Sequence, residues 1–252
     1  MEFRKVFDSI PDLFDKYRPR YTPELFNALI EYSHLSSEKS VLEIGPGTGQ
    51  ASDPILKTGC NYLAIELGEH LAEKMNQKYH AYPNFHIVND DFITHDFGKE
   101  RFDLIYSAAT IQWIPEDIAF SKTFQLLKSG GVLAMILIHA DYKTPNEELY
   151  NKIQESYAQF FKPEIEYKHG LFTYTNAPNY GYVNFERREF YSRRELTADE
   201  YVNLSCTHCD HIVIPEPYKS KLLDGLRTAV IEAGNKIVFN DTSILYLARK
   251  PL

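Results

Sequence analysis

The chain is poor in cysteine, has no long apolar run and carries no excess of basic residues. It has three cysteines in 252 residues, whereas the disulfide frameworks of small extracellular domains use an even number. No run of about 18 apolar residues occurs, so we expect no helix that spans a membrane. The segment from Met1 to Ile10 carries four charges and no apolar stretch, unlike a secretory signal. We therefore expect a cytoplasmic protein with reduced thiols.

Basic residues are outnumbered by acidic ones. The chain has 27 Lys and Arg against 35 Asp and Glu, which gives a net charge of −8. A broad nucleic-acid surface needs clustered positive charge, so we expect no DNA partner. One dense basic cluster exists, with glutamates between its members as on a solvated strand face; it contains Arg187, Arg188, Arg193 and Arg194. A local patch of this kind leaves an RNA or protein substrate open.

What the chain does have is a glycine-rich turn directly after an apolar, strand-like segment. Residues 41–49 read Val-Leu-Glu-Ile-Gly-Pro-Gly-Thr-Gly. Glycine has no Cβ and tolerates positive φ, so such a backbone can approach a ligand closely. A helix that opens after the turn directs its free N–H groups at the same ligand. The pattern is typical of a turn that binds a cofactor.

The spacing separates two kinds of cofactor. A dinucleotide site needs G-x-G-x-x-G/A, and Gln50 occupies the last position of that pattern here, which disfavours a nicotinamide oxidoreductase. The pattern is instead E-x-G-x-G-x-G, which resembles the first motif of the class I S-adenosylmethionine-dependent methyltransferases. The resemblance implies that Gly45, Gly47 and Gly49 lie under the methionine part of the cofactor. It also implies that Glu43 helps to orient the amino group of the cofactor.

Strand and helix patterns alternate from residue 40 onward. We predict apolar strands over 40–44, 61–66, 85–89, 102–107 and 131–138, as expected of parallel strands covered on both faces. Helices are predicted over 8–17, 22–32, 67–79, 115–127, 146–161 and 217–233, with Thr22 as a cap and a capping box at Thr197. The tail, 236–250, reads as two strands separated by Asn240-Asp241. The alternation predicts an α/β fold with a doubly wound, mostly parallel sheet.

Residues 140–215 interrupt this alternation and are rich in Tyr and Phe. We interpret them as an inserted, α-rich aromatic cap that covers the site and holds the substrate. Most of their aromatic side chains are expected in the core of the cap itself. The remaining residues, 1–139 and 216–252, then form the S-adenosylmethionine-binding domain with the Rossmann-like fold that the resemblance implies.

Acidic and aromatic residues follow the predicted strands where the resembled family binds its cofactor. Glu66 ends the second strand, where an acid in a nucleotide-binding α/β unit accepts hydrogen bonds from ribose hydroxyls. We assign it, with Leu67, to the cofactor. The resemblance implies that Asp91 bonds the adenine amino group and that Phe92 flanks the ring. Asp90 competes with Asp91, because strand ends slip by one residue when they are inferred from sequence.

The segment 102–113, the fourth strand and its exit, looks like the family's fourth motif. In that motif the loop lies beside the sulfonium, which implies that Ser107 contacts the cofactor. The ending Gln112-Trp113 is similar to that of small-molecule methyltransferases of the trans-aconitate type, so we assign both residues to the substrate. A place for Trp113 in the core is an equal alternative. The Asn/Asp-Pro-Pro-Tyr/Phe motif of nucleic-acid-amine methyltransferases is missing here, which disfavours methylation of DNA amines.

Three further residues are candidates for contact with the reacting groups. Tyr17 and Arg18 lie in a Tyr-Arg-Pro segment similar to one in this methyltransferase group, where N-terminal helices close over the cofactor. We assign Tyr17 to the methionine end and to catalysis, and Arg18 to a carboxylate of cofactor or substrate, because its planar fork suits that geometry. His139 follows the predicted fifth strand, where ligands of open sheets bind, and its imidazole suits a general base that contacts the substrate. A surface position is the alternative for Arg18, and a structural or solvated histidine is the alternative for His139.

The segment Cys206-Thr207-His208-Cys209-Asp210-His211 resembles a metal-binding segment in composition. A tetrahedral zinc site usually takes its ligands from two separated pairs, and no second pair lies nearby in the sequence. We therefore expect no bound metal and interpret the segment as a partly buried helix end.

Together the motifs predict an S-adenosylmethionine-dependent methyltransferase that forms S-adenosylhomocysteine and methylates a small-molecule acceptor. The assignments of Arg18 and of the Gln-Trp ending favour a carboxylate. A protein that binds the cofactor without turnover, and an RNA or protein methyltransferase, stay open as alternatives. The sequence does not fix the acceptor atom, and it leaves an oligomer open.

Overall fold

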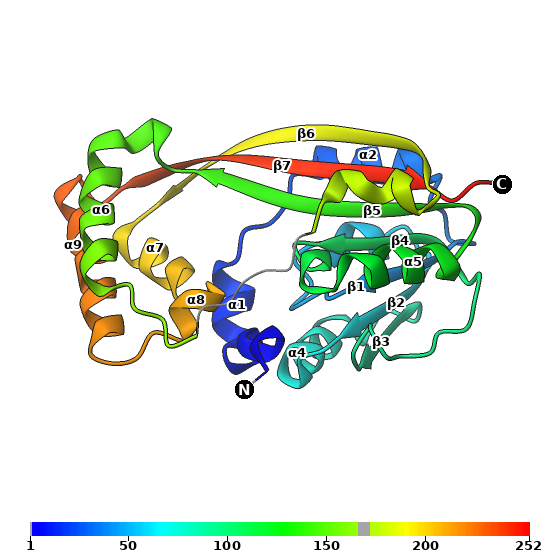
Figure 1. Cartoon of the computed structure of the whole chain (residues 1–252), viewed down its shortest axis with the longest axis horizontal. Coiled ribbons are helices and arrows are strands. Elements are labelled where there is room, and N and C mark those ends of the chain that lie inside the picture. The colour runs from blue at the N-terminus through cyan, green and yellow to red at the C-terminus, as the bar shows by residue number, and fades with distance from the viewer. Residues whose placement is uncertain (1, 166–171) are drawn as a thin grey trace. The chain divides into compact units, whose positions relative to one another are not determined.

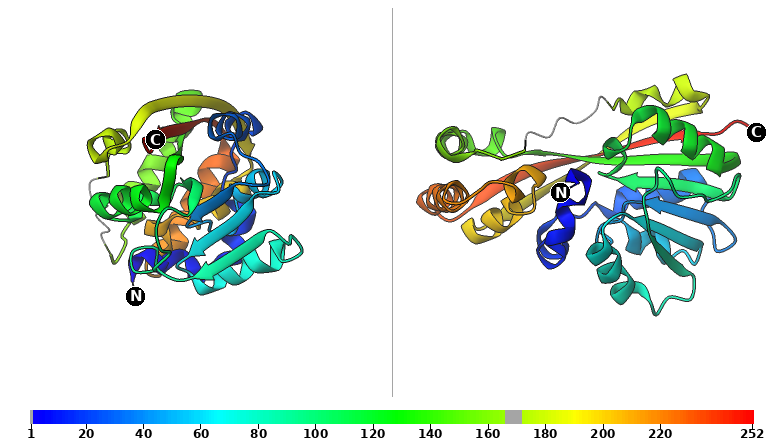
Figure 2. Two further views of the ribbon diagram at one scale, coloured as in Figure 1. Left: turned by 90° about the vertical axis from the view of Figure 1, so that its right-hand side faces the viewer. Right: turned by 60° about the horizontal axis from the view of Figure 1, so that its bottom comes forward.

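The computed structural model describes residues 2–165 and 172–252. These residues fall into two compact units, which we describe separately (Figure 1; Figure 2). The sheet unit comprises the described residues within Pro19–Ile138, His169–Phe190 and Ser243–Leu252. The helical unit comprises those within Met1–Arg18, His139–Lys168 and Tyr191–Thr242.

Seven strands form one sheet in the order β3-β2-β1-β4-β5-β7-β6. Parallel pairs join β1 to β2 and β4, β2 to β3, and β4 to β5. The arrows of β5 and β7 point in opposite directions in Figure 1, so this part of the sheet is antiparallel. The predicted doubly wound, mostly parallel sheet is confirmed. The strands are β1 (Ser40–Ile44), β2 (Asn61–Glu66), β3 (Phe85–Asn89), β4 (Phe102–Ala108), β5 (Leu127–Asp141), β6 (Val183–Leu196) and β7 (Ile237–Arg249).

The sheet unit buries apolar side chains on both faces of the sheet. Val41 of β1 belongs to a core cluster with residues of α2 (Pro23–Ser33), α3 (Ser52–Leu56) and α4 (Glu69–Tyr79). The next residue, Leu42, belongs to a second cluster with residues of α5 (Glu116–Leu126). Successive side chains of a strand point to opposite faces, so α2, α3 and α4 cover one face and α5 covers the other. This double cover explains why the parallel strands read as apolar runs.

The helical unit has an apolar core of its own, built by α6 (Glu147–Phe160), α7 (Ala198–Ser205) and α9 (Tyr218–Glu232). The predicted capping box opens α7: the N–H of Glu200 donates to Thr197 Oγ1 at 3.4 Å, and the N–H of Thr197 donates to Glu200 Oε2 at 2.8 Å. The other helices of this unit are short: η1 (Phe3–Ser9), α1 (Pro11–Tyr17), η3 (Thr144–Asn146) and α8 (Cys209–Ile212). None of the helices in the described residues is both long and apolar enough to cross a membrane.

Two predicted features of individual elements are wrong. The tail forms one continuous strand, β7, in place of two strands separated at Asn240-Asp241. Asp241 is 2% exposed and forms an ion pair with Arg194 of β6, so a buried partner lets the acid stay inside the strand. Thr22 precedes α2 as predicted but makes no capping hydrogen bond.

The division into a cofactor domain and an inserted cap at residues 140–215 stays a prediction. The compact units divide the chain at other residues, because β5, β6 and β7 each have residues in both units. Residues 172–190 of the predicted cap belong to the sheet unit and include η4 (Tyr174–Tyr180). The long strand β6 also lies in the stretch for which mainly helices were expected.

Candidate functional site

The glycine turn follows β1 and leads into α3. Gly45, Gly47 and Gly49 have φ angles of 62°, 60° and 86°, a region that residues with a Cβ rarely adopt. A Cβ on Gly45 would lie 2.2 Å from Cγ2 of Thr110, and one on Gly49 would lie 2.7 Å from Cε2 of Tyr79. The turn therefore needs glycine both for its backbone conformation and for the close approach of its neighbours.

Glu66 ends β2 and ties the glycine turn to the loop before α4. The residue is 6% exposed. Its Oε2 accepts a hydrogen bond from the N–H of Gly47 at 2.9 Å, and its Oε1 accepts one from the N–H of Gly68 at 2.9 Å. Leu67 lies between these contacts, before α4 begins. The structure thus joins Glu66 to the turn and to the loop that contains Leu67, and the assignment of Glu66 and Leu67 to the cofactor stays a prediction.

Glu43 lies in β1, two residues before the turn, and is 1% exposed. Its Oε2 accepts hydrogen bonds from Ser52 Oγ at 2.5 Å and from the hydroxyl of Tyr62, whose oxygen lies 2.8 Å from that of Tyr106. Its Oε1 has no hydrogen-bond partner among the described residues. Burial raises the pKa of the Glu43 carboxyl above its ordinary value. One oxygen is therefore held by hydroxyl groups, and the other is a buried acceptor.

The two acids that follow β3 differ in their neighbours. Asp90 Oδ2 lies 2.8 Å from Nδ1 of His95, a hydrogen bond that lowers the pKa of Asp90. Phe92 is 5% exposed and packs against Phe97 with a ring-centroid distance of 5.9 Å. Asp91 also has a partner, since its Oδ1 accepts a hydrogen bond from the N–H of Ile93 at 2.9 Å. The assignments of Asp91 and Phe92 to the adenine ring stay predictions.

The exit of β4 is bonded to the end of β1. The hydroxyl of Ser107, which is buried, donates to the carbonyl of Ile44 at 3.0 Å. The hydroxyl of Thr110 donates to the carbonyl of Gly45 at 2.9 Å. These two bonds hold the start of the turn beside β4. A contact between Ser107 and the cofactor stays a prediction.

Gln112 and Trp113 lie in the short helix η2 (Ile111–Trp113), and both are half-buried. Gln112 Nε2 donates to the carbonyl of Ala109 at 3.1 Å, and its Oε1 accepts a hydrogen bond from the hydroxyl of Tyr174 at 2.9 Å. Burial raises the pKa of Tyr174. The role of Gln112 and Trp113 in binding a substrate stays a prediction.

Tyr17, Arg18 and His139 belong to the helical unit, whereas the glycine turn belongs to the sheet unit. Arg18 Nη2 donates to the carbonyl of Thr207 at 2.9 Å, and its guanidinium lies 5.1 Å from the centroid of the Phe14 ring. His139 is exposed and lies within β5. Its predicted place after the strand is wrong, because pairing with a neighbouring strand, rather than the apolar run, determines where β5 ends.

The segment 206–211 gathers polar side chains within the helical unit. Potential ligand atoms of His208, Asp210 and His211 all lie within 4.8 Å of one another. The two nitrogens of His211 already have partners: Nδ1 lies 2.7 Å from Asp210 Oδ1, and Nε2 lies 2.8 Å from the hydroxyl of Tyr157. Burial lowers the pKa of His208 to about 3. These contacts satisfy the ring of His211 through the protein, and the expectation of no metal stays a prediction.

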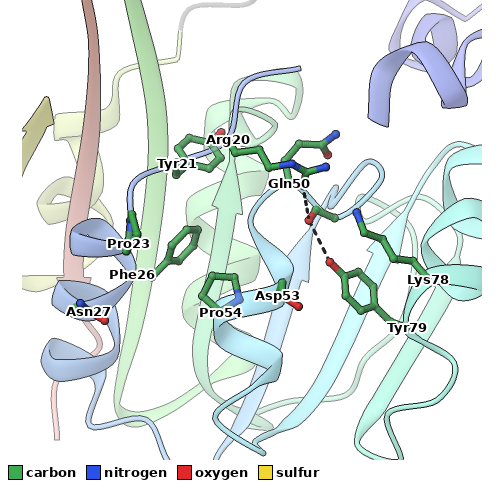
Figure 3. Close-up of a pocket in the computed structure, with 11 residues that line it drawn as sticks. Arg20, Tyr21, Pro23, Phe26, Asn27, Gln50, Asp53, Pro54, Lys78 and Tyr79 are labelled. Atoms are coloured by element: carbon green, nitrogen blue, oxygen red, sulfur yellow. Dashed lines mark hydrogen bonds between the residues drawn. The ribbon is translucent and has the colours of Figure 1, made fainter. Parts of the chain in front are cut away.

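A cleft of about 400 Å³ opens beside the glycine turn (Figure 3). It is bordered by the start of α2, the turn, the start of α3 and the end of α4. The residues that line it are Arg20, Tyr21, Pro23, Phe26, Asn27, Gly49, Gln50, Asp53, Pro54, Lys78 and Tyr79. None of these except Gly49 was among the predicted site residues, since they are brought together from three separate segments.

Comparison with known proteins gives a family match over the part of the chain that contains the glycine turn. Residues 42–135 match the family described as methyltransferase domain. The chain is 29% identical over 131 residues to malonyl-acyl-carrier protein O-methyltransferase 1 of Ilyobacter polytropus, over 51% of this chain and 46% of that protein. It is 34% identical over 153 residues to ribosomal RNA small subunit methyltransferase A of Hahella chejuensis, over 56% of this chain and 54% of that protein. The chain thus spans about half of the length of these relatives.

The fold is shared with solved methyltransferases. Phosphoethanolamine N-methyltransferase 2 of Haemonchus contortus, solved with phosphomonomethylethanolamine and S-adenosylhomocysteine, superposes with a TM-score of 0.60 at 15% identity, over 100% of this chain and 61% of that one. At this identity the likeness shows the fold alone. Residues 42–135 therefore match a methyltransferase domain, within a fold that solved methyltransferases share.

The residues of the turn site fit the cofactor of such a domain. The turn has no Cβ atom at Gly45, Gly47 and Gly49, and Glu66 places a carboxylate at the end of the neighbouring strand. The buried Oε1 of Glu43 is an acceptor that suits a donor on a ligand or on a water molecule.

Sequence reasoning missed the residues that support the turn. Ser52, Tyr62 and Tyr106 surround Glu43, and Thr110 holds the carbonyl of Gly45. A signal for one of them exists in the strand register, because Tyr106 of β4 pairs directly with Glu43 of β1. Thr110 carries no comparable signal, since it lies in a loop whose path the sequence does not define.

Proposed function

We propose that the protein transfers a methyl group from S-adenosylmethionine to a small-molecule acceptor and releases S-adenosylhomocysteine. One observation carries the proposal: three positive-φ glycines follow β1, and the N–H of the middle one, Gly47, donates to the buried carboxylate of Glu66 at the end of β2. The family match over residues 42–135 supports it. When bound, the cofactor would supply an already activated methyl group, so the protein contributes binding, orientation and electrostatics.

The chain's own groups would hold the two ends of the cofactor. Gly45, Gly47 and Gly49 would admit the methionine part to the backbone, and Oε1 of Glu43 would accept a hydrogen bond at that end. Glu66 would accept hydrogen bonds from the ribose hydroxyls. The other proposed contacts are Leu67, Asp91, Phe92, Ser107, Tyr17 and Arg18. Alignment of the reacting atoms alone can be worth about 7–11 kcal/mol of the barrier.

For the acceptor we favour a small carboxylic acid of the trans-aconitate type, shielded from water by residues of 140–215. The Gln112-Trp113 ending supports this choice, as does a relative that is named an O-methyltransferase. A carboxylate can accept the methyl group without a general base. A hydroxyl, amine or carbon acid would need a group such as His139 or Tyr17 to take its proton.

An RNA acceptor is the second candidate, because one relative is named a ribosomal RNA methyltransferase. The net charge of −8 disfavours it, since RNA binding relies on contacts between phosphates and clustered Lys and Arg. A protein that binds the cofactor without turnover is the third candidate. Only a test for product separates it from an enzyme.

Calorimetric titration with S-adenosylmethionine and S-adenosylhomocysteine tests the cofactor assignment. We expect both to bind, and we expect Glu66→Gln to weaken each by about tenfold or more through loss of a charged hydrogen-bond acceptor. Glu69→Gln is the matched control, because Glu69 is exposed in the first turn of α4. Absence of binding, or equal affinity in the two variants, would contradict the assignment.

Formation of S-adenosylhomocysteine with a panel of small di- and tricarboxylic acids then tests the acceptor. Product that depends on one of these acids supports the proposed enzyme. Cofactor binding without product from any acid, amine, hydroxyl compound or RNA would favour the protein without turnover. Product with RNA alone would favour the second candidate.

A further inference from the structure

The cleft beside the glycine turn carries two cations that converge on the backbone of the turn (Figure 3). Lys78 Nζ lies 3.1 Å from the carbonyl oxygen of Thr48, and Arg20 Nη1 lies 3.5 Å from that of Gly49. Both Lys78 and Arg20 are exposed. They come from distant parts of the sequence, since Arg20 precedes α2 and Lys78 lies in the last turn of α4. The fold has therefore placed two positive groups at one edge of the turn.

The cleft also contains a carboxylate, which has a cationic partner. Asp53 is the one acid among the described residues that line the cleft. Its Oδ2 lies 2.6 Å from Nζ of Lys57, four residues later in the chain. Lys57 therefore offsets the charge of Asp53 from outside the lining. The described lining thus holds two cationic side chains and one carboxylate that is itself paired with a lysine, on a chain whose net charge is −8.

The rest of the lining is largely apolar and aromatic. Tyr21 and Phe26 pack edge to face with a centroid distance of 6.3 Å. Tyr79 is 3% exposed, and its hydroxyl donates to the carbonyl of Gly49 at 3.3 Å. Small-molecule sites combine a mostly apolar wall with a few polar groups in volumes of about 300–1,000 Å³. A cleft of about 400 Å³ lies at the lower end of this range and suits a small ligand.

We propose that this cleft binds the carboxylate of a small organic acid between Arg20 and Lys78, with the apolar part of the acid against the aromatic wall. The planar fork of an arginine matches a carboxylate in bidentate geometry, and a lysine adds a compact charge. The sequence assigned this task to Arg18, which donates to Thr207 within the helical unit. With a separate acid the site goes beyond the proposed methyl transfer, and with the amino-acid end of the cofactor it rests on that function. In both cases the cofactor-free protein suffices to test carboxylate binding.

The contacts of the two cations connect this site to the turn. Arg20 and Lys78 lie against the carbonyl groups of Gly49 and Thr48, so a bound carboxylate competes with these carbonyls for the same donors. Its binding should change the environment of the amide groups of residues 48–50. Two sources of the carboxylate are compatible with the chemistry: the amino-acid end of the cofactor and a separate organic acid.

Amide NMR spectra of the ¹⁵N-labelled, cofactor-free protein, titrated with phenylacetate and with acetate, test the proposal. We expect both probes to shift the amide signals of residues 48–50 and phenylacetate to bind more tightly, because its ring contacts the aromatic wall. Arg20→Gln and Lys78→Gln should each weaken phenylacetate binding by about tenfold, as expected for loss of a charge-assisted contact. Lys99→Gln, an exposed lysine outside the lining, is the matched control.

The proposal is overturned if residues 48–50 do not respond, or if the cleft variants bind phenylacetate as the control does. Circular dichroism spectra of the two cleft variants distinguish a loss of binding from a loss of fold. If one variant unfolds, the other still tests the proposal.

Competition experiments distinguish the two sources of the carboxylate. Displacement of phenylacetate by S-adenosylhomocysteine, but not by methylthioadenosine, which lacks the amino-acid part, would assign the site to the cofactor's carboxylate. Equal binding of phenylacetate with and without S-adenosylhomocysteine would assign it to a separate acid. Displacement by methylthioadenosine as well would show that the overlap does not involve a carboxylate and would overturn the assignment. Failure of S-adenosylhomocysteine to bind at all would count against the proposed function and not against this site.

Discussion

Single residues hold the glycine turn from both of its sides. Ser52, the first residue of α3, donates to the carboxyl group of Glu43 in β1. The strand before the turn and the helix after it therefore share one buried group. Thr110 holds the carbonyl of Gly45 from the β4 side. Two short hydrogen-bonded links thus fix the backbone that a ligand would approach.

Replacement of Glu43 by Gln should change the pH dependence of stability. Burial raises the pKa of Glu43 above its ordinary value of 4.5, so between 4.5 and the higher folded pKa the folded state binds more protons than the unfolded chain. The proton bound to Glu43 in the folded state adds to the free energy of unfolding. This contribution is fully present below pH 4.5 and is lost as the pH rises through the folded pKa. Because Gln does not titrate, the free energy of unfolding of Glu43→Gln should gain on that of the parent as the pH rises. Urea unfolding at a series of pH values measures this, and a pH-independent difference would contradict it.

Replacement of Gly45 by Ala should destabilise the protein by about 2–5 kcal/mol, because it adds a left-handed backbone penalty to an overpacked contact. The new Cβ would lie 2.2 Å from Cγ2 of Thr110. The double variant Gly45→Ala/Thr110→Ser removes that methyl group and keeps the hydroxyl. It should recover part of the loss in free energy of unfolding. No recovery would show that the backbone conformation alone sets the cost.

At the scale of the elements, a threonine precedes both α2 and α7, but only one of the two threonines caps its helix with a hydrogen bond. Thr197 forms a reciprocal capping box with Glu200 at the start of α7, whereas Thr22 makes no capping hydrogen bond at the start of α2. Thr197→Ala should therefore lower the free energy of unfolding by about 1 kcal/mol. Thr22→Ala should change it by less than about 0.5 kcal/mol. Denaturant unfolding of the two variants checks the contrast, and equal losses would show that the capping bond does not contribute.

The elements could largely be predicted from the sequence where burial sets the pattern. β1, β2 and β3 were predicted at their observed residues, because β1 is largely apolar up to the glycine turn and β2 and β3 each end at a polar residue. The single strand β7 was missed, since Asn240-Asp241 reads as a turn until Arg194 of another strand supplies a partner. Local patterns do not contain that long-range pair. The capping box at Thr197 was found because its donors and acceptors lie within four residues.

For the candidate site as well, local sequence patterns suffice for some residues, whereas others depend on the packing of distant segments. The glycines and Glu66 were found because one backbone requirement and one strand end define them. The positions of Arg20 and Lys78 in one cleft could not be found, because they depend on how α2 and α4 lie against the turn. Arg18 and Arg20 are equivalent in the sequence, and only the structure shows that Arg20 reaches the turn.

At the scale of the whole molecule, charge separates the acceptor classes. With 35 acidic and 27 basic residues, the protein should repel a polyanion over most of its surface. We expect a fluorescent oligonucleotide of RNA to bind more weakly than the dissociation constants of about 10⁻⁴–10⁻⁶ M that are typical of non-specific nucleic-acid binding. Fluorescence anisotropy at physiological salt measures this. Tighter, salt-dependent binding would favour the RNA candidate over the small acid.

The order of the strands has a consequence for synthesis of the protein. β7 lies between β5 and β6 in the sheet, and its residues Leu245 and Leu247 are fully buried in the sheet unit. Because the ribosome releases residues in sequence order, the edge of β5 that pairs with β7 stays open until residues near 249 have emerged. An open strand edge is a template for pairing with another chain. The growing chain is therefore open to aggregation until its synthesis has passed β7, whatever the stability of the finished fold.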